Sequence, residues 1–122
     1  MILLDTSIWV DHLRSGDARV AELLTLGRIM AHPFVIGELA LGHLRERAMI
    51  LTALSDLPQA RPASDAETLF FIERHGLAGR GISYVDAHLL AATRLTAGCS
   101  FWTRDRRLAA LAEEMGLAAV SG

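Results

Sequence analysis

Four acidic residues occupy positions where charged side chains are unusual. Asp5 directly follows the apolar run 2–4, and the other three lie within or directly after short apolar segments. These three are Glu38, Asp86 and Asp105. A carboxylate that is desolvated and unpaired costs on the order of several kcal/mol. We therefore expect the four acids to lie at the mouth of a site, or to be met by a cation.

The spacing of these acids predicts that they converge. Asp5 and Asp105 follow predicted strands, and Asp86 lies three residues after Ser83, the predicted cap of a helix. In the first turn of a helix, the backbone N–H groups and the helix dipole favour a carboxylate. Glu38 lies about one turn into its predicted helix, among residues that otherwise face the core. Because sites in open α/β sheets form outside the carboxyl ends of the strands, we expect all four on one edge.

Converged carboxylates repel one another. Two unit charges about 4 Å apart cost roughly 4 kcal/mol at the effective dielectric of a protein surface. Protonation or a bound cation would relieve this repulsion. An oxygen-only set of ligands, with no accompanying histidine or cysteine set, favours Mg²⁺ or Mn²⁺ over zinc. Such a site suits hydrolysis of phosphoryl bonds, because a metal ion lowers the pKa of an attacking water.

Each acid also has an ordinary structural explanation. Asp5 and Asp86 could be helix caps, and Asp105 could start the last helix, which for each acid alone is the commoner role. Glu38 is explained neither by capping nor by a solvated face. The hypothesis of a cation site therefore rests on the four acids together.

Short apolar segments alternate with helical patterns along the chain. Strands are predicted at 2–4, 29–31, 101–103 and 117–120, and the connector 57–62 could hold another. Helices are predicted at 8–13, 17–26, 33–41, 45–54, 64–75, 83–96 and 106–115. The predicted caps include Thr6 and Ser7 before the first helix, Asp17 at the second and Ser64, in a capping box, at the fifth. This alternation indicates an α/β fold with a parallel sheet of four or five short strands, sandwiched by helices. The length of 122 residues indicates a single domain, 1–122.

Composition narrows the class of protein. The net charge of −2 argues against a simple electrostatic binder of nucleic acid. All basic side chains are arginine, and the absence of lysine excludes a P-loop, a Schiff-base enzyme and the phosphatases and receiver domains that need a lysine beside their aspartate. The arginines Arg104, Arg106 and Arg107 surround Asp105. They could contact an RNA backbone, or form a solvated helix start or a salt bridge with a neighbour.

The apolar content is high for a chain of this size. Hydrophobic residues make up 52% of it, and the mean hydropathy is +0.32. Because a small domain has little interior, we expect a homodimer or a tightly bound partner. No apolar run is long enough to span a membrane, and the N-terminus lacks the features of a signal peptide. The single cysteine, Cys99, suggests a reducing cytoplasm.

Four sequence motifs carry a resemblance to a known family. They are MILLDTSIW at 1–9, VIGEL at 35–39, GISYVDAHLLAAT at 81–93 and FWTRD at 101–105. In order and spacing they resemble the motifs of PIN-domain ribonucleases, and more narrowly those of VapC-type toxins of toxin–antitoxin pairs. Each motif alone is weak, but the ordered set is specific and covers essentially the whole chain.

The resemblance implies a PIN-like α/β/α sandwich with Mg²⁺- or Mn²⁺-dependent endoribonuclease activity. It also implies a homodimer that is inhibited by a small cognate antitoxin. Asp5, Glu38, Asp86 and Asp105 match the acidic positions of the family, with Asp5, Asp86 and Asp105 as metal ligands. The supporting hydroxyls of the family match Ser7 and Thr103. The alternatives are a catalytically silent RNA- or protein-binding module and a small metal phosphatase.

Overall fold

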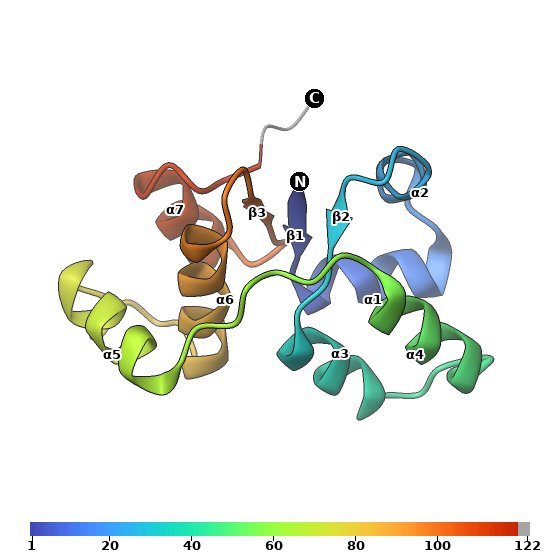
Figure 1. Ribbon diagram of the computed structural model, residues 1–122, viewed down its shortest axis with the longest axis horizontal. Coiled ribbons are helices and arrows are strands. Elements are labelled where there is room, and N and C mark those ends of the chain that lie inside the picture. Colours follow the sequence, from blue (N-terminus) through green and yellow to red (C-terminus); the bar gives the residue numbers. More distant parts are fainter. Residues whose placement is uncertain (120–122) are drawn as a thin grey trace.

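Helices and strands alternate along residues 1–119, the part of the chain that the computed structural model describes (Figure 1). Its strands are β1 (Ile2–Leu4), β2 (Ile29–Met30) and β3 (Ser100–Trp102). Its helices are α1 (Thr6–Ser15), α2 (Ala18–Thr25), α3 (Pro33–Ala40), α4 (Arg47–Asp56), α5 (Asp65–Arg74), α6 (Tyr84–Leu95) and α7 (Arg106–Glu114). The predicted α/β class with a parallel sheet is confirmed.

The sheet has the strand order β2-β1-β3, and both pairs are parallel. The prediction of four or five strands is wrong, since residues 1–119 contain three. The connector 57–62 and the predicted strand 117–120 each contribute a single bridge, Ala31 with Gln59 and Phe101 with Ala118. Pro58 and Pro62 flank Gln59 and lack N–H donors, so that segment cannot extend its pairing. The last residue of the predicted strand 117–120 lies outside the described residues.

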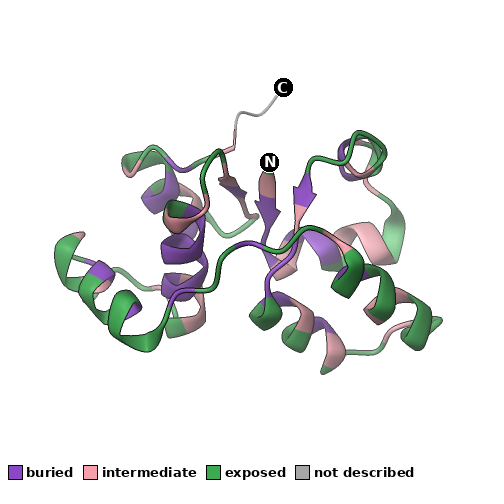
Figure 2. Ribbon diagram, in the orientation of Figure 1, coloured by how far each residue is buried: buried purple, intermediate pink, exposed green. Residues whose placement is uncertain are grey.

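Helices cover the sheet from both sides. In Figure 1, α5, α6 and α7 lie to the left of the strands, α1, α2 and α4 lie to the right, and α3 lies below. Helix α6 packs on β3 and α5, and α1 packs on β1 and α3. Figure 2 shows α6 buried over most of its length, and the seven residues 87–93 are all buried. This helix forms the centre of its layer because it lies between the sheet and α5.

The first helix begins earlier than the sequence suggested. Thr6 and Ser7 were expected as caps of a helix from Ile8, but Asp5 is the cap and Thr6 is the first helical residue. The carboxylate of Asp5 accepts the N–H of Thr6 at 2.8 Å. Capping by Asp5 leaves the hydroxyl groups of Thr6 and Ser7 available for contacts outside the helix.

Other helix starts follow the sequence closely. Asp17 caps α2, as predicted, and Ser64 and Ser83 each form a capping box. Helix α4 begins at Arg47, two residues after its predicted start. The residue before it, Glu46, has φ +51°, which is outside the helical region. Within residues 1–119, no helix is long and apolar enough to cross a membrane.

The buried face of α6 offers a test of this core. Leu90 has no exposed surface, so we expect Leu90→Ala to lower the free energy of unfolding by about 2 to 5 kcal/mol through lost burial and the cavity left behind. Leu41→Ala is the control, because Leu41 is 90% exposed; its effect should stay within about 0.5 kcal/mol. Urea denaturation followed by circular dichroism measures both. Equal effects of the two substitutions would contradict this packing.

Candidate functional site

The Asp5 carboxylate is buried at the carboxyl end of the central strand, with 8% of the residue exposed. Its Oδ1 accepts the N–H of Thr6. Its Oδ2 accepts the hydroxyl of Ser7 at 3.1 Å and that of Thr103 at 2.7 Å. All three donors are uncharged, so they orient the carboxylate without neutralising it.

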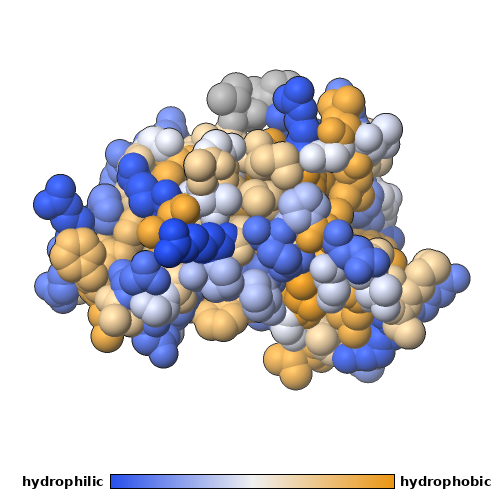
Figure 3. All heavy atoms as spheres, viewed as in Figure 1, coloured by the Kyte–Doolittle hydropathy of each residue, from blue (hydrophilic) through white to orange (hydrophobic). Residues whose placement is uncertain are grey.

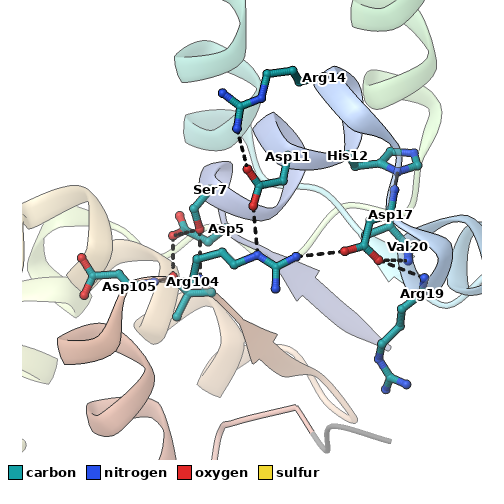
Figure 4. A network of polar contacts seen from close by, with 11 residues as sticks. Asp5, Ser7, Asp11, His12, Arg14, Asp17, Arg19, Val20, Arg104 and Asp105 are labelled. Atoms are coloured by element: carbon teal, nitrogen blue, oxygen red, sulfur yellow. Dashed lines mark hydrogen bonds and ion pairs between the residues drawn. The ribbon is translucent and has the colours of Figure 1, made fainter.

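Two hydroxyl groups connect Asp5 to the loop between β3 and α7. The hydroxyl oxygen of Ser7 accepts the N–H of Arg104 at 3.1 Å, and that of Thr103 accepts the N–H of Asp105 at 3.1 Å. Each hydroxyl therefore donates to Asp5 and accepts from the loop. Figure 4 shows Ser7 between Asp5 and the backbone of Arg104. The predicted supporting residues Ser7 and Thr103 lie beside Asp5.

Asp86 lies in the first turn of α6, where it forms a capping box with Ser83. Its Oδ2 accepts the N–H of Ser83 at 3.0 Å, and its own N–H donates to the Ser83 hydroxyl at 3.1 Å. Burial raises the pKa of Asp86, the hydrogen bonds from Ser83 oppose this, and the negative charges of Asp5 and Asp105 raise the pKa further. The three aspartates are therefore within electrostatic reach of one another.

Asp105 is the exposed aspartate of the three. It caps α7, and its Oδ1 accepts the N–H of Leu108 at 2.9 Å. Its Oδ2 has no hydrogen bond to another described residue, and the same is true of Oδ1 of Asp86. Each of these two carboxylates therefore keeps one oxygen for a ligand.

Glu38 differs from its prediction. It was expected among core-facing residues, but it is exposed. Helix α3 buries Val35 and Leu39, which lie four residues apart on one face, and so Glu38 faces away from the core. Its Oε1 accepts the hydroxyl of Thr6 at 2.6 Å, which places Glu38 next to the residue that follows Asp5.

Capping and clustering occur together in this site. Asp5, Asp86 and Asp105 lie at the starts of α1, α6 and α7, where helix dipoles stabilise negative charge. Capping alone would lower the pKa of Asp86, yet burial and the two neighbouring carboxylates raise it. The helix starts hold the aspartates, and the charges of Asp5 and Asp105 add to the effect of burial on the pKa of Asp86.

The donor set of this site fits a hard cation. Within residues 1–119, no three acidic, histidine or cysteine side chains form a ready-made group of metal ligands. A closed group is not required, since Mg²⁺ commonly binds through one or two carboxylates and keeps several waters. A cation near Asp86 would also offset the two negative charges that raise the pKa of this residue. Asp5, Asp86 and Asp105 are the residues that could hold it.

The three arginines near Asp105 have different surroundings. Arg104 forms ion pairs with Asp11 and Asp17, which is the salt-bridge alternative that the sequence left open. The side chain of Arg107 lies against Gly81, so close that a β-carbon there would clash with it. Arg106 is exposed at the start of α7.

Comparison with known proteins identifies the family. A model of the PIN domain matches residues 2–114, and the chain belongs to the PIN-domain family. It is also 46% identical over 118 residues to a protein named ribonuclease VapC32, in two strains of Mycobacterium tuberculosis, CDC 1551 / Oshkosh and ATCC 25618 / H37Rv. The match covers 97% of this chain and 95% of each relative. The resemblance seen in the four motifs is thereby confirmed.

Sequence reasoning missed two residues near the site. Thr6 was interpreted only as a helix cap, although it joins α1 to Glu38 across 32 positions. Asp11 was not considered at all, yet it binds Arg104 across 93 positions. The hydroxyl of Thr6, directly after Asp5, was a usable signal. Nothing in the local sequence distinguishes Asp11 from a solvated helix residue.

The raised pKa of Asp86 gives a pH-dependent prediction. An aspartate whose pKa is raised in the folded state does not affect stability below the unfolded-state value of about 3.9, and destabilises progressively as the pH rises through the folded-state value. Asn removes the charge and keeps an oxygen for the N–H of Ser83. In chelator at about pH 7 we therefore expect Asp86→Asn to melt at the same temperature as the wild type or higher, with any gain disappearing towards about pH 3.9.

Asp17→Asn provides a control of opposite sign. Hydrogen bonds from the backbone of Val20 and Arg19, and the Arg104 side chain, lower the pKa of Asp17 against the effect of burial. This aspartate stabilises the fold above the unfolded-state pKa, and that contribution is lost as the pH falls through the folded-state value. Asp17→Asn should therefore melt lower than the wild type at neutral pH. If Asp86→Asn and Asp17→Asn lowered the melting temperature equally, Asp86 would act only as a helix cap.

Proposed function

We propose that this protein is a metal-dependent endoribonuclease and the toxin of a type II toxin–antitoxin pair. The observation that carries the proposal is the placement of three aspartates at the starts of α1, α6 and α7, with the buried Asp5 carboxylate oriented by the hydroxyls of Ser7 and Thr103. The family and the name of its relative, ribonuclease VapC32, support nuclease activity. An oxygen-only acidic site of this kind suits hydrolysis of a phosphodiester.

Three aspartates would bind the cation, and Glu38 would act on the attacking water. Asp5, Asp86 and Asp105 would hold one or two Mg²⁺ ions, for which Mn²⁺ can substitute. When bound, such a cation would supply Lewis acidity and lower the pKa of the attacking water. Glu38 is exposed and has one carboxylate oxygen beyond its bond to Thr6, so it can orient that water or accept its proton. Ser7 and Thr103 fix the direction of the Asp5 carboxylate.

We assign the contacts with the RNA backbone to Arg106 and Arg107. Arg107 lies against Gly81, two residues before Ser83, and so joins the start of α7 to the segment that leads into α6. These two helix starts carry Asp105 and Asp86. A guanidinium at this place can bind a phosphate beside the scissile bond with two parallel hydrogen bonds.

A cleavage assay tests the proposal. Purified protein should cut total RNA with Mg²⁺ or Mn²⁺ and stop in chelator. We expect Asp5→Asn and Asp86→Asn to lower the rate at least about 100-fold, since even the partners of metal ligands are worth about 10- to 100-fold. Glu38→Gln should lower it by about 100- to 10,000-fold with a smaller loss of metal affinity. In its loss of metal affinity, Asp105→Asn should fall between Asp86→Asn and Glu38→Gln. Asp56→Asn is the control, because Asp56 is an exposed acid on α4.

Two outcomes would contradict this function. RNA binding without cleavage would indicate a silent binding module. Hydrolysis of a phosphomonoester with intact RNA would indicate a phosphatase. Mapping the cut sites would then define the RNA preference of an active enzyme.

The partner of this toxin would be a small cognate antitoxin. The exposed acids Glu38 and Asp105 offer a surface that an arginine of the partner can bind with paired hydrogen bonds, in place of the cation. We place the pair in the cytoplasm, where a lone thiol such as Cys99 stays reduced.

We also propose that the toxin is a homodimer. Large apolar side chains are exposed on two helical layers, and Figure 3 shows apolar surface at the lower right, over α3 and α4. The exposed apolar side chains include Leu41 at the end of α3 and Met49 on α4, and Leu69 and Phe70 on α5. Light scattering at low micromolar concentration should give about twice the monomer mass of 13.2 kDa. A clean 13.2 kDa species would contradict the dimer.

A further inference from the structure

The side chain of Arg104 contacts three residues outside the acidic site, two aspartates and a tryptophan. Its Nε donates to Oδ2 of Asp11 at 3.0 Å, and its Nη2 donates to Oδ2 of Asp17 at 2.9 Å. The guanidinium carbon lies 5.4 Å from the ring centre of Trp102. Figure 4 shows the side chain extending from the loop towards α1 and the start of α2. The loop before α7 is thereby tied to two other helices.

The main chain of the same residue is tied to the site. Arg104 stands between Thr103, which donates to Asp5, and Asp105, which caps α7. Its N–H donates to the hydroxyl of Ser7, which in turn donates to Asp5. One residue thus connects the acidic site, through its backbone, to an ion-pair network, through its side chain.

This network has its own anchors. Asp17 is fixed by the N–H groups of Arg19 and Val20, and its own N–H donates to Nδ1 of His12. Asp11 also accepts from Arg14 at 3.2 Å. Two acids, Asp11 and Asp17, thus pair with two arginines, Arg14 and Arg104. The two carboxylates already offset the charge of the Arg104 guanidinium, so it attracts a phosphate less than an arginine without acidic neighbours would.

The main effect of these contacts is to hold the loop before α7 in place, because their contribution to the free energy of folding is small. Single ion pairs at a surface contribute about 0 to 1 kcal/mol, and more when several charges form a network. Asp105, however, is exposed and belongs to a short loop, so its carboxylate is placed only as well as that loop is held. Residues that orient metal ligands are worth about 10- to 100-fold in metal affinity.

We propose that Arg104 is a positioning residue for the cation site, which holds the loop carrying Thr103 and Asp105 in place and does not contact RNA. The inference deepens the proposed function and rests on it, because it assumes that the aspartates bind a divalent cation. It assigns separate roles to neighbouring arginines: Arg104 positions the acids, whereas Arg107 meets the substrate.

The first measurement is Mn²⁺ affinity of the RNA-free protein, by calorimetric titration after removal of metal with chelator. We expect Arg104→Gln to weaken binding about 10- to 100-fold, as for other residues that orient metal ligands. Arg104→Lys should restore part of this, because an ammonium group can reach one acid but cannot reproduce the planar fork. Arg14→Gln is the matched control: it shares Asp11 but lies outside the loop, so affinity should change less than about 2-fold.

A mutant cycle keeps the inference testable even if Arg104→Gln folds poorly. The double substitution Asp11→Asn, Asp17→Asn removes both ion pairs, while Asn still caps α2. It should weaken Mn²⁺ binding as Arg104→Gln does. Adding Arg104→Gln to it should then cause little further loss, because both changes remove the same contacts.

The second measurement is RNA cleavage against Mn²⁺ and salt concentration. With saturating Mn²⁺, Arg104→Gln should recover most of the wild-type rate and keep its salt dependence. Arg107→Gln should weaken RNA binding, lower the salt slope by about one and leave Mn²⁺ affinity unchanged.

Each contrary result has a definite meaning. Wild-type Mn²⁺ affinity in Arg104→Gln and in the double substitution would overturn the positioning role, as would a reduced salt slope in Arg104→Gln. Absence of Mn²⁺ binding by the wild type would overturn it together with the proposed cation site. Mn²⁺ binding that depends on Arg104, without RNA cleavage by the wild type, would overturn only the proposed nuclease function.

Discussion

The site depends on a buried carboxylate that is oriented by uncharged donors. Asp5 accepts hydrogen bonds from the backbone of Thr6 and the hydroxyls of Ser7 and Thr103, so its charge is fixed in direction but not cancelled. The parallel pairing of β1 with β3 makes this possible. Leu4 lies opposite Trp102, and the residues that follow them, Asp5 and Thr103, therefore emerge side by side. The charge of Asp5 then acts on Asp86, whose pKa it helps to raise.

The three aspartates are placed by helix starts. At the beginning of α1, α6 and α7, backbone N–H groups bind one oxygen of Asp5, Asp86 and Asp105. The local hydrogen bonds and helix dipoles offset part of the repulsion between the carboxylates. For Asp86 the remaining effect of burial and neighbouring charge is still unfavourable to ionisation. The same feature that starts each helix thus presents an acid to the common edge of the sheet.

The outer parts of the site are arranged by side chains from distant segments. Glu38 stands on the exposed face of α3 and reaches the site through Thr6. Arg104 bridges the last loop to Asp11 and Asp17, so the acids of α1 and α2 contribute to the shape of a site that they do not enter. Both exposed acids of the site are connected to the first helix: Glu38 accepts from Thr6, and Asp105 follows Arg104, whose N–H donates to Ser7.

The sequence by itself determined the features that depend on neighbouring residues. The apolar runs that became β1, β2 and β3, the caps Asp17, Ser64 and Ser83, and the α/β class all follow from local patterns of polarity and hydrogen bonding. The four motifs also indicated the family, because their order is written along the chain. Even Asp5 and Asp86 were recognised as possible caps from their immediate surroundings.

Only the tertiary structure decided which distant residues meet. The order of the strands, β2-β1-β3, depends on which segments pair across the sheet, which local propensity does not specify. The exposure of Glu38 followed from which face of α3 packs on the core. The partners of Arg104 lie 93 and 87 positions away, and they meet it because β1 and β3 pair in one register. Residue type alone does not select these partners, because any exposed acid within reach can pair with an arginine. The strand register selects them, since it decides which acids lie within reach.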